Sequence, residues 1–191
     1  KYSQHSPKNM EPESPDRFWL LTWTTYGTWL PGDGRGSITT IRDEPSGEWY
    51  RPNEYGTPVV PPSSGLEFLA RGRMTGPPVR LNQEMAEMAA HQFQETARYR
   101  GWSIMALAIM ANHVHVVLGT PGDPDPAQML RDLKSYGART LNKLYGRPQS
   151  GTWWTAGGSR RILKEDHSVM AAIEYVMSQE HPLFLWRKAP G

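Results

Sequence analysis

The chain has 191 residues, of which 38% are hydrophobic and 21% are charged, and its formal net charge is +2. This composition indicates one globular domain with some additional segments, and it excludes a fibrous or wholly disordered protein. The sequence contains no cysteine, which excludes disulfides and thiolate metal sites, and no apolar stretch approaches the about 18 residues of a membrane helix. We therefore expect a cytoplasmic protein that does not interact with a membrane.

Three segments of different character follow from the N-terminus. Residues 1–16 are polar and contain three prolines, so we expect a disordered tail. Residues 18–29 are rich in aromatic residues, leucine and threonine, which predicts the first strand. Residues 31–79 are dense in glycine, proline and serine, so we expect a long loop insertion, either one wall of a binding groove or a surface excursion without a direct role.

The remainder of the chain alternates between helical and strand patterns up to residue 181, and we expect 182–191 to be a C-terminal tail. The predicted elements are a helix over 81–100, strands over 102–110 and 113–119, a helix over 127–145, a strand over 159–163 and a helix over 168–179. This order predicts a single α+β domain over 17–181, with a ferredoxin-like or RRM-like antiparallel sheet packed against helices.

Two histidines in the predicted strand 113–119 are the first candidates for chemistry. Residues two apart in a strand point to the same face and lie about 6.6 Å apart along it, so His113 and His115 can bind one metal ion. Val114 and Val116 then point to the opposite face, towards the core. The same spacing is also compatible with a partly exposed histidine pair that binds no metal.

Tyr136 lies on the predicted helix 127–145, which carries a stripe of leucines. A helix turns by about 100° per residue, which places Tyr136 at the edge of the buried face, where its hydroxyl can enter a cleft. Asp132, Arg139 and Lys143 fall on the same flank, and the two cations suit a phosphate diester. Alternatively, Tyr136 covers the stripe and the cations form a solvated face.

A His-apolar-His strand followed by a helix with one tyrosine resembles the HUH endonucleases. The resemblance is to the single-tyrosine transposases of small insertion sequences (IS200-like) and to the REP-associated tyrosine transposases. It continues in FWLLTWTTYGTWLPG, RGWSIMALAIMANHVHVVL, LKSYGARTLNKLYG, GTWWTAGGSRRIL and AAIEYV. The similar region spans 18–176, and 32–79 is the part that matches least.

The resemblance implies a metal-dependent endonuclease and strand transferase, an enzyme of DNA transposition, that acts on single-stranded DNA at hairpin-flanked sites. His113 and His115 would bind Mg²⁺ or Mn²⁺, which polarises the scissile phosphate. Tyr136 would attack phosphorus and leave a 5′-phosphotyrosine and a free 3′-hydroxyl. Insertion-sequence relatives are typically dimers and REP-associated relatives tend to act as monomers, so both a monomer and a homodimer stay open. The longer C-terminal part resembles the REP-associated group and favours the monomer.

One position departs from the family pattern. In many of these transposases a glutamine one turn after the tyrosine completes the metal shell, but Thr140 stands one turn after Tyr136. Threonine is a poor ligand, so Asp132, Asn112, Asn142 or the phosphate and water would have to fill the gap. The departure leaves a second function open, in which the chain is a domesticated protein that binds DNA hairpins and has little cleavage activity.

Two arginines next to a tryptophan pair complete the candidates. Arg160 and Arg161 could hold phosphates while Trp153 and Trp154 stack on bases, as in single-strand binding proteins. A core tryptophan pair beside a surface arginine pair is the alternative. Arg160 and Arg161, together with Arg139 and Lys143, are the predicted DNA-binding residues.

Overall fold

The computed structural model describes residues 15–34, 41–42, 49–50 and 62–189. Most of the expected N-terminal tail and part of the expected loop insertion lie outside these described residues. The helices and strands, in chain order, are β1 (Arg17–Thr24), β2 (Ile41–Arg42), β3 (Trp49–Tyr50), α1 (Ser64–Gly72), α2 (Gln83–Tyr99), β4 (Ser103–Ile109), β5 (His113–Thr120), α3 (Pro126–Tyr145), β6 (Ser159–Leu163), α4 (Asp166–Met177) and β7 (Phe184–Arg187).

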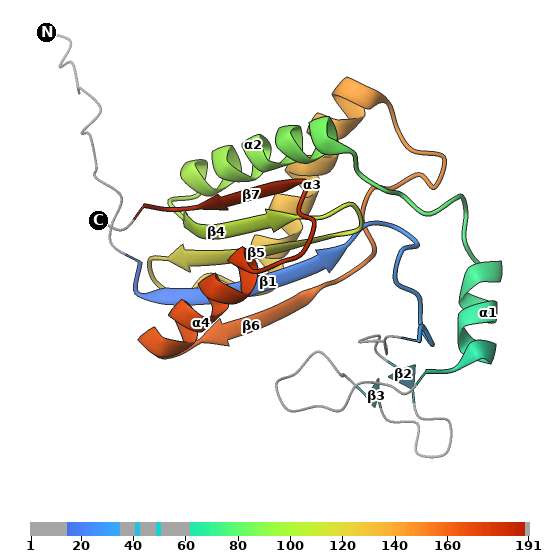
Figure 1. Cartoon of the computed structure of the whole chain (residues 1–191), viewed down its shortest axis with the longest axis horizontal. Helices are drawn as coiled ribbons and strands as arrows, with labels where there is room; N and C mark the ends of the chain where they lie inside the picture. The colour runs from blue at the N-terminus through green and yellow to red at the C-terminus, as the bar shows by residue number, and fades with distance from the viewer. Residues whose placement is uncertain (1–14, 35–40, 43–48, 51–61, 190–191) are drawn as a thin grey trace, which may run out of the picture.

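A five-stranded antiparallel sheet with the strand order β6-β1-β5-β4-β7 forms the centre of the fold (Figure 1). Apart from the segment that contains β2, β3 and α1, the unit from β1 to β6 has the order strand, helix, strand, strand, helix, strand, and β1 and β5 are its two inner strands. This is the ferredoxin-like arrangement. The predicted α+β fold class is therefore confirmed, with β7 added beside β4.

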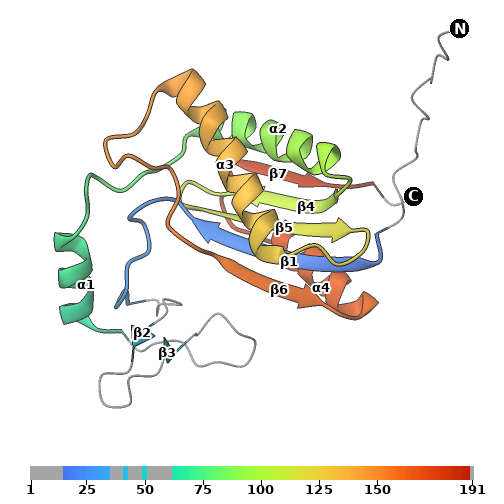
Figure 2. The ribbon, with the colours of Figure 1, turned by 180° about the vertical axis from the view of Figure 1, so that it is seen from behind.

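The helices cover opposite faces of the sheet. The larger core cluster joins Trp23 of β1 and Val114 of β5 to residues of α2 and α3. The smaller cluster joins Val117 of β5 to Ile173 and other residues of α4. Accordingly, α4 lies in front of the sheet in Figure 1, and α3 lies in front of it in Figure 2, which shows the sheet from behind. We call these the α4 face and the α3 face.

Local signals in the sequence explain where the two long helices begin and how closely they pack. The Asn82 side chain accepts a hydrogen bond from the backbone N–H of Met85 and caps α2, and Asp125 caps α3 through the N–H of Ala127. Gly137 lets α3 approach Phe93 of α2, because a Cβ there would lie 2.6 Å from the phenylalanine ring. Among the described helices, none is both long and apolar enough to cross a membrane.

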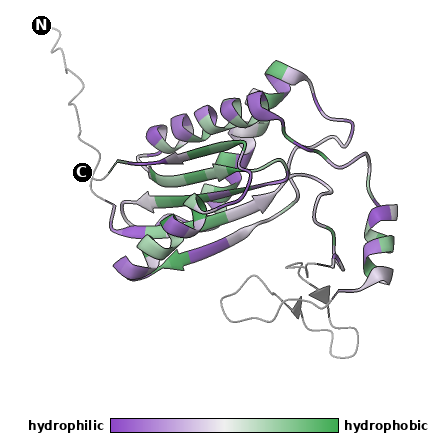
Figure 3. Ribbon diagram, viewed as in Figure 1, coloured by the Kyte–Doolittle hydropathy of each residue, from purple (hydrophilic) through white to green (hydrophobic). Residues whose placement is uncertain are grey.

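Two regions differ from the expected organisation. The expected C-terminal tail contains β7, which pairs with β4 and places Trp186 opposite Leu107. The expected loop insertion contains α1, whose nine residues include no buried side chain. Both elements are short, so their hydrophobic patterns repeat too few times to be distinguished from a loop. Figure 3 shows the apolar residues concentrated on the central strands β4 and β5.

Candidate functional site

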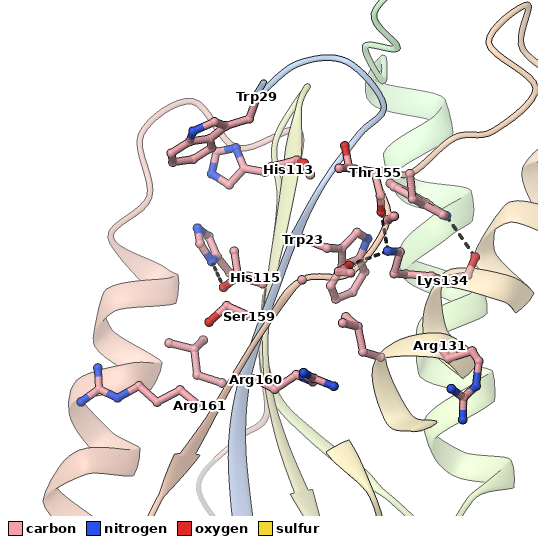
Figure 4. Close-up of a pocket in the computed structure, with 18 of the residues that line it drawn as sticks. Trp23, Trp29, His113, His115, Arg131, Lys134, Thr155, Ser159, Arg160 and Arg161 are labelled. Carbon is pink, nitrogen blue, oxygen red and sulfur yellow. Dashed lines mark hydrogen bonds between the residues drawn. The ribbon is translucent and has the colours of Figure 1, made fainter. Parts of the chain in front are cut away.

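The predicted histidine pair lies side by side on the α4 face of the sheet. His113 and His115 are in β5, opposite Thr24 and Thr22 of β1, and their ring centroids are 4.9 Å apart. Trp29, from the segment after β1, lies beside His113 (Figure 4). The strand alternation therefore brings the two imidazoles together, as the spacing predicted.

Both imidazoles are held through Nδ1. His113 donates from Nδ1 to Oδ1 of Asn112 at 2.7 Å, and Nδ1 of His115 shares a 2.7 Å hydrogen bond with the hydroxyl of Thr22. In each ring Nε2 is then the nitrogen that a metal ion would take. Asn112 therefore orients a histidine through its side chain, which is a different role from that of a metal ligand.

The protonation state of His115 suits a metal ligand. Its side chain is buried, and burial, together with the nearby His113, lowers its pKa from 6.5 to about 3. At neutral pH the imidazole is therefore uncharged, which is the form that binds a metal ion. Within the described residues, no three His, Cys, Asp or Glu side chains form a metal cluster. A metal held by this pair would therefore need amide, water or phosphate oxygens to complete its shell.

A tyrosine from the last helix lies at the histidine pair. The hydroxyl of Tyr175, in α4, is 3.5 Å from Nε2 of His115, and the two rings meet edge to face with centroids 5.2 Å apart. Tyr175 is 48% exposed, so its hydroxyl is accessible to a large ligand. The prediction from sequence did not identify this residue.

Gln179 lies one turn after Tyr175 and lines the same cavity. Its side-chain nitrogen donates to the backbone carbonyl of Tyr175 at 2.9 Å, which leaves the amide oxygen as a potential ligand. This is the tyrosine-glutamine spacing that Tyr136 lacks, because Thr140 follows it. The spacing was therefore the signal in the sequence that would have selected Tyr175.

Tyr136 lies on the opposite face of the sheet from the histidines. It belongs to α3, whose buried residues join the larger core cluster with Val114, whereas the two histidines face α4. The guanidinium of Arg139 stacks on the Tyr136 ring at 4.8 Å from its centroid. The structure therefore does not bring Tyr136 together with His113 and His115, contrary to our prediction.

The other candidate ligands near Tyr136 hold α3 against α2. The hydroxyl of Thr140 donates to Oε1 of Gln92 at 2.6 Å. The buried carboxylate of Asp132 forms an ion pair with Arg100 at 2.9 Å. Neither Thr140 nor Asp132 lines the cavity that contains the histidines. Both contacts stabilise the packing of the two helices.

A cavity of about 1930 Å³ contains His113, His115, Tyr175 and Gln179. Among the described residues that line it there is no Asp or Glu, whereas five are arginine or lysine: Arg73, Arg131, Lys134, Arg160 and Arg161. A cavity with this charge attracts a polyanion, and a nucleic acid strand is a polyanion of suitable length.

The predicted DNA-binding residues separate into two groups. Arg160 and Arg161 line the cavity and are exposed, but Arg139 and Lys143, although exposed on α3, do not line it. The two tryptophans belong to the core: Trp153 and Trp154 are each 5% exposed, so they do not present a surface on which bases could stack.

Comparisons with known proteins found similar solved structures and a matching family model. A REP-associated tyrosine transposase, solved bound to a REP hairpin, is 13% identical, with a TM-score of 0.48 over 93% of this chain and 70% of that chain. A candidate transposase from Deinococcus radiodurans is 14% identical, with a TM-score of 0.43 over 94% of this chain and 98% of that chain. No curated protein sequence matches the chain significantly. The family model "Transposase IS200 like" matches residues 78–179, more than half of the chain and a region that includes both histidines and Tyr175, so the chain belongs to the IS200-like transposase family.

Proposed function

We propose that this transposase cleaves and rejoins single-stranded DNA at hairpin-flanked sites, with Tyr175 as its nucleophile in place of Tyr136. The observation that carries the proposal is the position of the Tyr175 hydroxyl, 3.5 Å from Nε2 of His115, in a cavity whose described lining has cations and no carboxylate. A phosphate diester bound at Nε2 of the histidines would lie within reach of that hydroxyl.

The side chains around the site support each part of the reaction. His113 and His115 would hold Mg²⁺ or Mn²⁺ through Nε2, and Gln179 would add its amide oxygen. The metal would supply polarisation of the scissile phosphate and stabilisation of a phenolate. Asn112 and Thr22 hold the two rings through hydrogen bonds to their Nδ1 atoms.

The covalent step conserves the phosphodiester bond energy. The Tyr175 oxygen forms a bond to phosphorus and loses its proton to solvent, while the bond from phosphorus to the 3′-oxygen breaks and that oxygen gains a proton. The products are a 5′-phosphotyrosine and a free 3′-hydroxyl. Attack by a 3′-hydroxyl on the phosphotyrosine reverses the step and joins a new strand without ATP.

The alternative of a domesticated hairpin-binding protein depended on Thr140 occupying the position of the family's glutamine. With Tyr175 as the nucleophile, that position belongs to Gln179, and the departure from the family pattern disappears. A functional nuclease is therefore the interpretation that the described geometry favours.

The test is to incubate the protein with Mn²⁺ and labelled single-stranded hairpins from the DNA that flanks its own gene, and to detect a protein-linked band on a denaturing gel. We expect a band that chelator abolishes. Tyr175→Phe should remove it, whereas the matched variant Tyr136→Phe should retain it, because Tyr136 lies across the sheet. A band that depends on Tyr136 would refute the assignment, and hairpin binding without any band would favour the binding protein.

A further inference from the structure

The cavity extends from the α4 face around the edge strand to the α3 face. Its catalytic part holds the histidines and Tyr175, and its second part is lined by residues of α3 and of the segment before β6. We call the second part the α3 lobe and define its charged residues as Arg131, Lys134 and Arg160. The proposed chemistry makes no use of these three cations.

The strand register assigns the two adjacent arginines of β6 to different faces. Arg160 pairs with Leu21, whose side chain belongs to the core on the α3 face, whereas Arg161 pairs with Leu20, which packs in the smaller cluster on the α4 face. Figure 4 shows their side chains leaving opposite sides of the strand, with Arg160 on the side of Arg131 and Lys134. Arg160 thus belongs with the α3 cations.

The three cations of the α3 lobe have no carboxylate partner among the described residues. Lys134 donates from Nζ to the backbone oxygens of Thr155 and Gly157, both at 2.6 Å, and Arg131 donates to Gln128 within its own helix. Burial without a counter-charge lowers the pKa of Lys134 from 10.5 to about 8. A bound phosphate would supply the missing negative charge.

Residues 155–158, which we call the ridge, line the cavity between β1 and Lys134 of α3. Residues 155–158 run beside β1, and the N–H of Thr155 donates to the carbonyl of Thr24 at 3.0 Å. Gly158 packs so closely on β1 that a Cβ would lie 2.7 Å from the carbonyl oxygen of Thr22, the residue that holds His115. Gly157 and Gly158 add no side chain to the cavity at this ridge.

We propose that the α3 lobe binds backbone phosphates of the DNA strand at nucleotides beside the scissile phosphate, so that the strand crosses the 155–158 ridge from one face of the sheet to the other. This inference rests on the proposed function, because it assumes that the same strand occupies the catalytic part. Phosphate contacts of this kind position a strand without reading its sequence. The α3 lobe therefore contributes affinity and register, and the histidine pair and Tyr175 contribute cleavage.

Binding measurements on single-charge variants test the α3 lobe. The probe is a fluorescein-labelled oligo-dT of about 20 nucleotides, long enough for several binding sites, in fluorescence anisotropy at several salt concentrations. Arg131→Gln and Arg160→Gln should each weaken binding about 3- to 10-fold and reduce the slope of log K against log salt by about 0.7. Arg139→Gln is the matched control, because Arg139 is on α3 but outside the cavity.

A crosslinking experiment locates the strand directly. The natural chain has no cysteine, so Arg160→Cys creates one unique thiol, which is modified with an aryl azide and irradiated with the hairpin substrate. We expect crosslinks to nucleotides near the cleavage site from Arg160→Cys and none from Arg139→Cys.

The outcomes separate the two proposals. If the Arg131 and Arg160 variants bind and crosslink DNA as the Arg139 controls do, the proposal that the α3 lobe binds DNA is wrong, even if Tyr175 still forms an adduct. If Arg131→Gln and Arg160→Gln weaken DNA binding as expected but the wild-type protein forms no adduct, the α3 lobe is retained as a DNA-binding site and the nuclease is refuted.

Discussion

Alanine substitutions of Gln179 and Thr140 are expected to have opposite effects on metal affinity and on stability. If Tyr175 is the nucleophile, the family's metal-binding glutamine corresponds to Gln179. If Tyr136 is the nucleophile, Thr140 stands at the position of that glutamine. Replacing each by alanine therefore distinguishes the two assignments without touching a tyrosine or a histidine. The structure gives a different expectation for stability and for metal affinity in each variant.

Gln179→Ala removes one of three proposed protein donors from the metal. Loss of such a group typically lowers metal affinity about 10-fold, which corresponds to about 1.4 kcal/mol. Its side chain donates a hydrogen bond to the carbonyl of Tyr175 at the C-terminal end of α4, so the free energy of unfolding should change by less than about 1 kcal/mol.

Thr140→Ala should have the opposite profile. Its hydroxyl donates to Gln92 at 2.6 Å across the α2–α3 interface, so its loss leaves a partly buried amide without that donor and should cost about 1 kcal/mol. Thr140 lies outside the cavity, so the affinity for Mn²⁺ should not change.

Two measurements decide between these profiles. The electron paramagnetic resonance signal of free Mn²⁺ gives metal affinity, and urea unfolding followed by tryptophan fluorescence gives stability. The Mn²⁺ concentration for half-maximal adduct formation provides an independent value for the DNA-bound enzyme. If Thr140→Ala weakens Mn²⁺ binding and Gln179→Ala does not, the reasoning that places the metal beside α4 is wrong.

Three further predictions concern the fold and its pH dependence. Gly137→Ala should lower the free energy of unfolding by about 1–3 kcal/mol, measured in urea, because its Cβ would lie 2.6 Å from the Phe93 ring. Asp132→Asn should cost about 1–2 kcal/mol in the same assay by weakening the ion pair with Arg100, with Mn²⁺ affinity unchanged. Between pH 8 and 10.5, Lys134 has released its proton in the folded protein but keeps it in the unfolded chain, so the free energy of unfolding should rise with pH. In urea unfolding at several pH values, Lys134→Met should lack this part of the rise.

Hydrophobic periodicity was sufficient to predict the core of the fold. The long helices α2 and α3 and the strands β1, β4 and β5 repeat their patterns over several turns or alternations, and the structure contains each of them near its predicted range. The hairpin between β4 and β5 also forms at Ala111 and Asn112. In contrast, β7 has four residues and α1 packs no side chain into the core, so neither has a pattern strong enough to detect.

The histidine pair could be predicted because a strand fixes the relation between residues two apart. The tyrosine could not be selected by the same kind of local argument. Tyr136 and Tyr175 both lie at the edge of the buried face of an amphipathic helix, so the helical wheel gives them equal standing. A wheel describes the sides of one helix, and it does not say which face of the sheet that helix covers.

The handedness of the chain connections supplies the missing information. In the order strand, helix, strand, strand, helix, strand, each helix connects two parallel strands, and such crossovers are right-handed in almost every known case. Both α2 and α3 must therefore cover one face, and their apolar stripes require the face to which Val114 and Val116 point. His113 and His115 alternate with these valines and point to the other face. Among the helices predicted from the sequence, only one after this unit can cover that face, and the last predicted helix carries Tyr175 with Gln179 one turn later. The comparison of Tyr175→Phe with Tyr136→Phe is thus a test of which face of the sheet performs the chemistry.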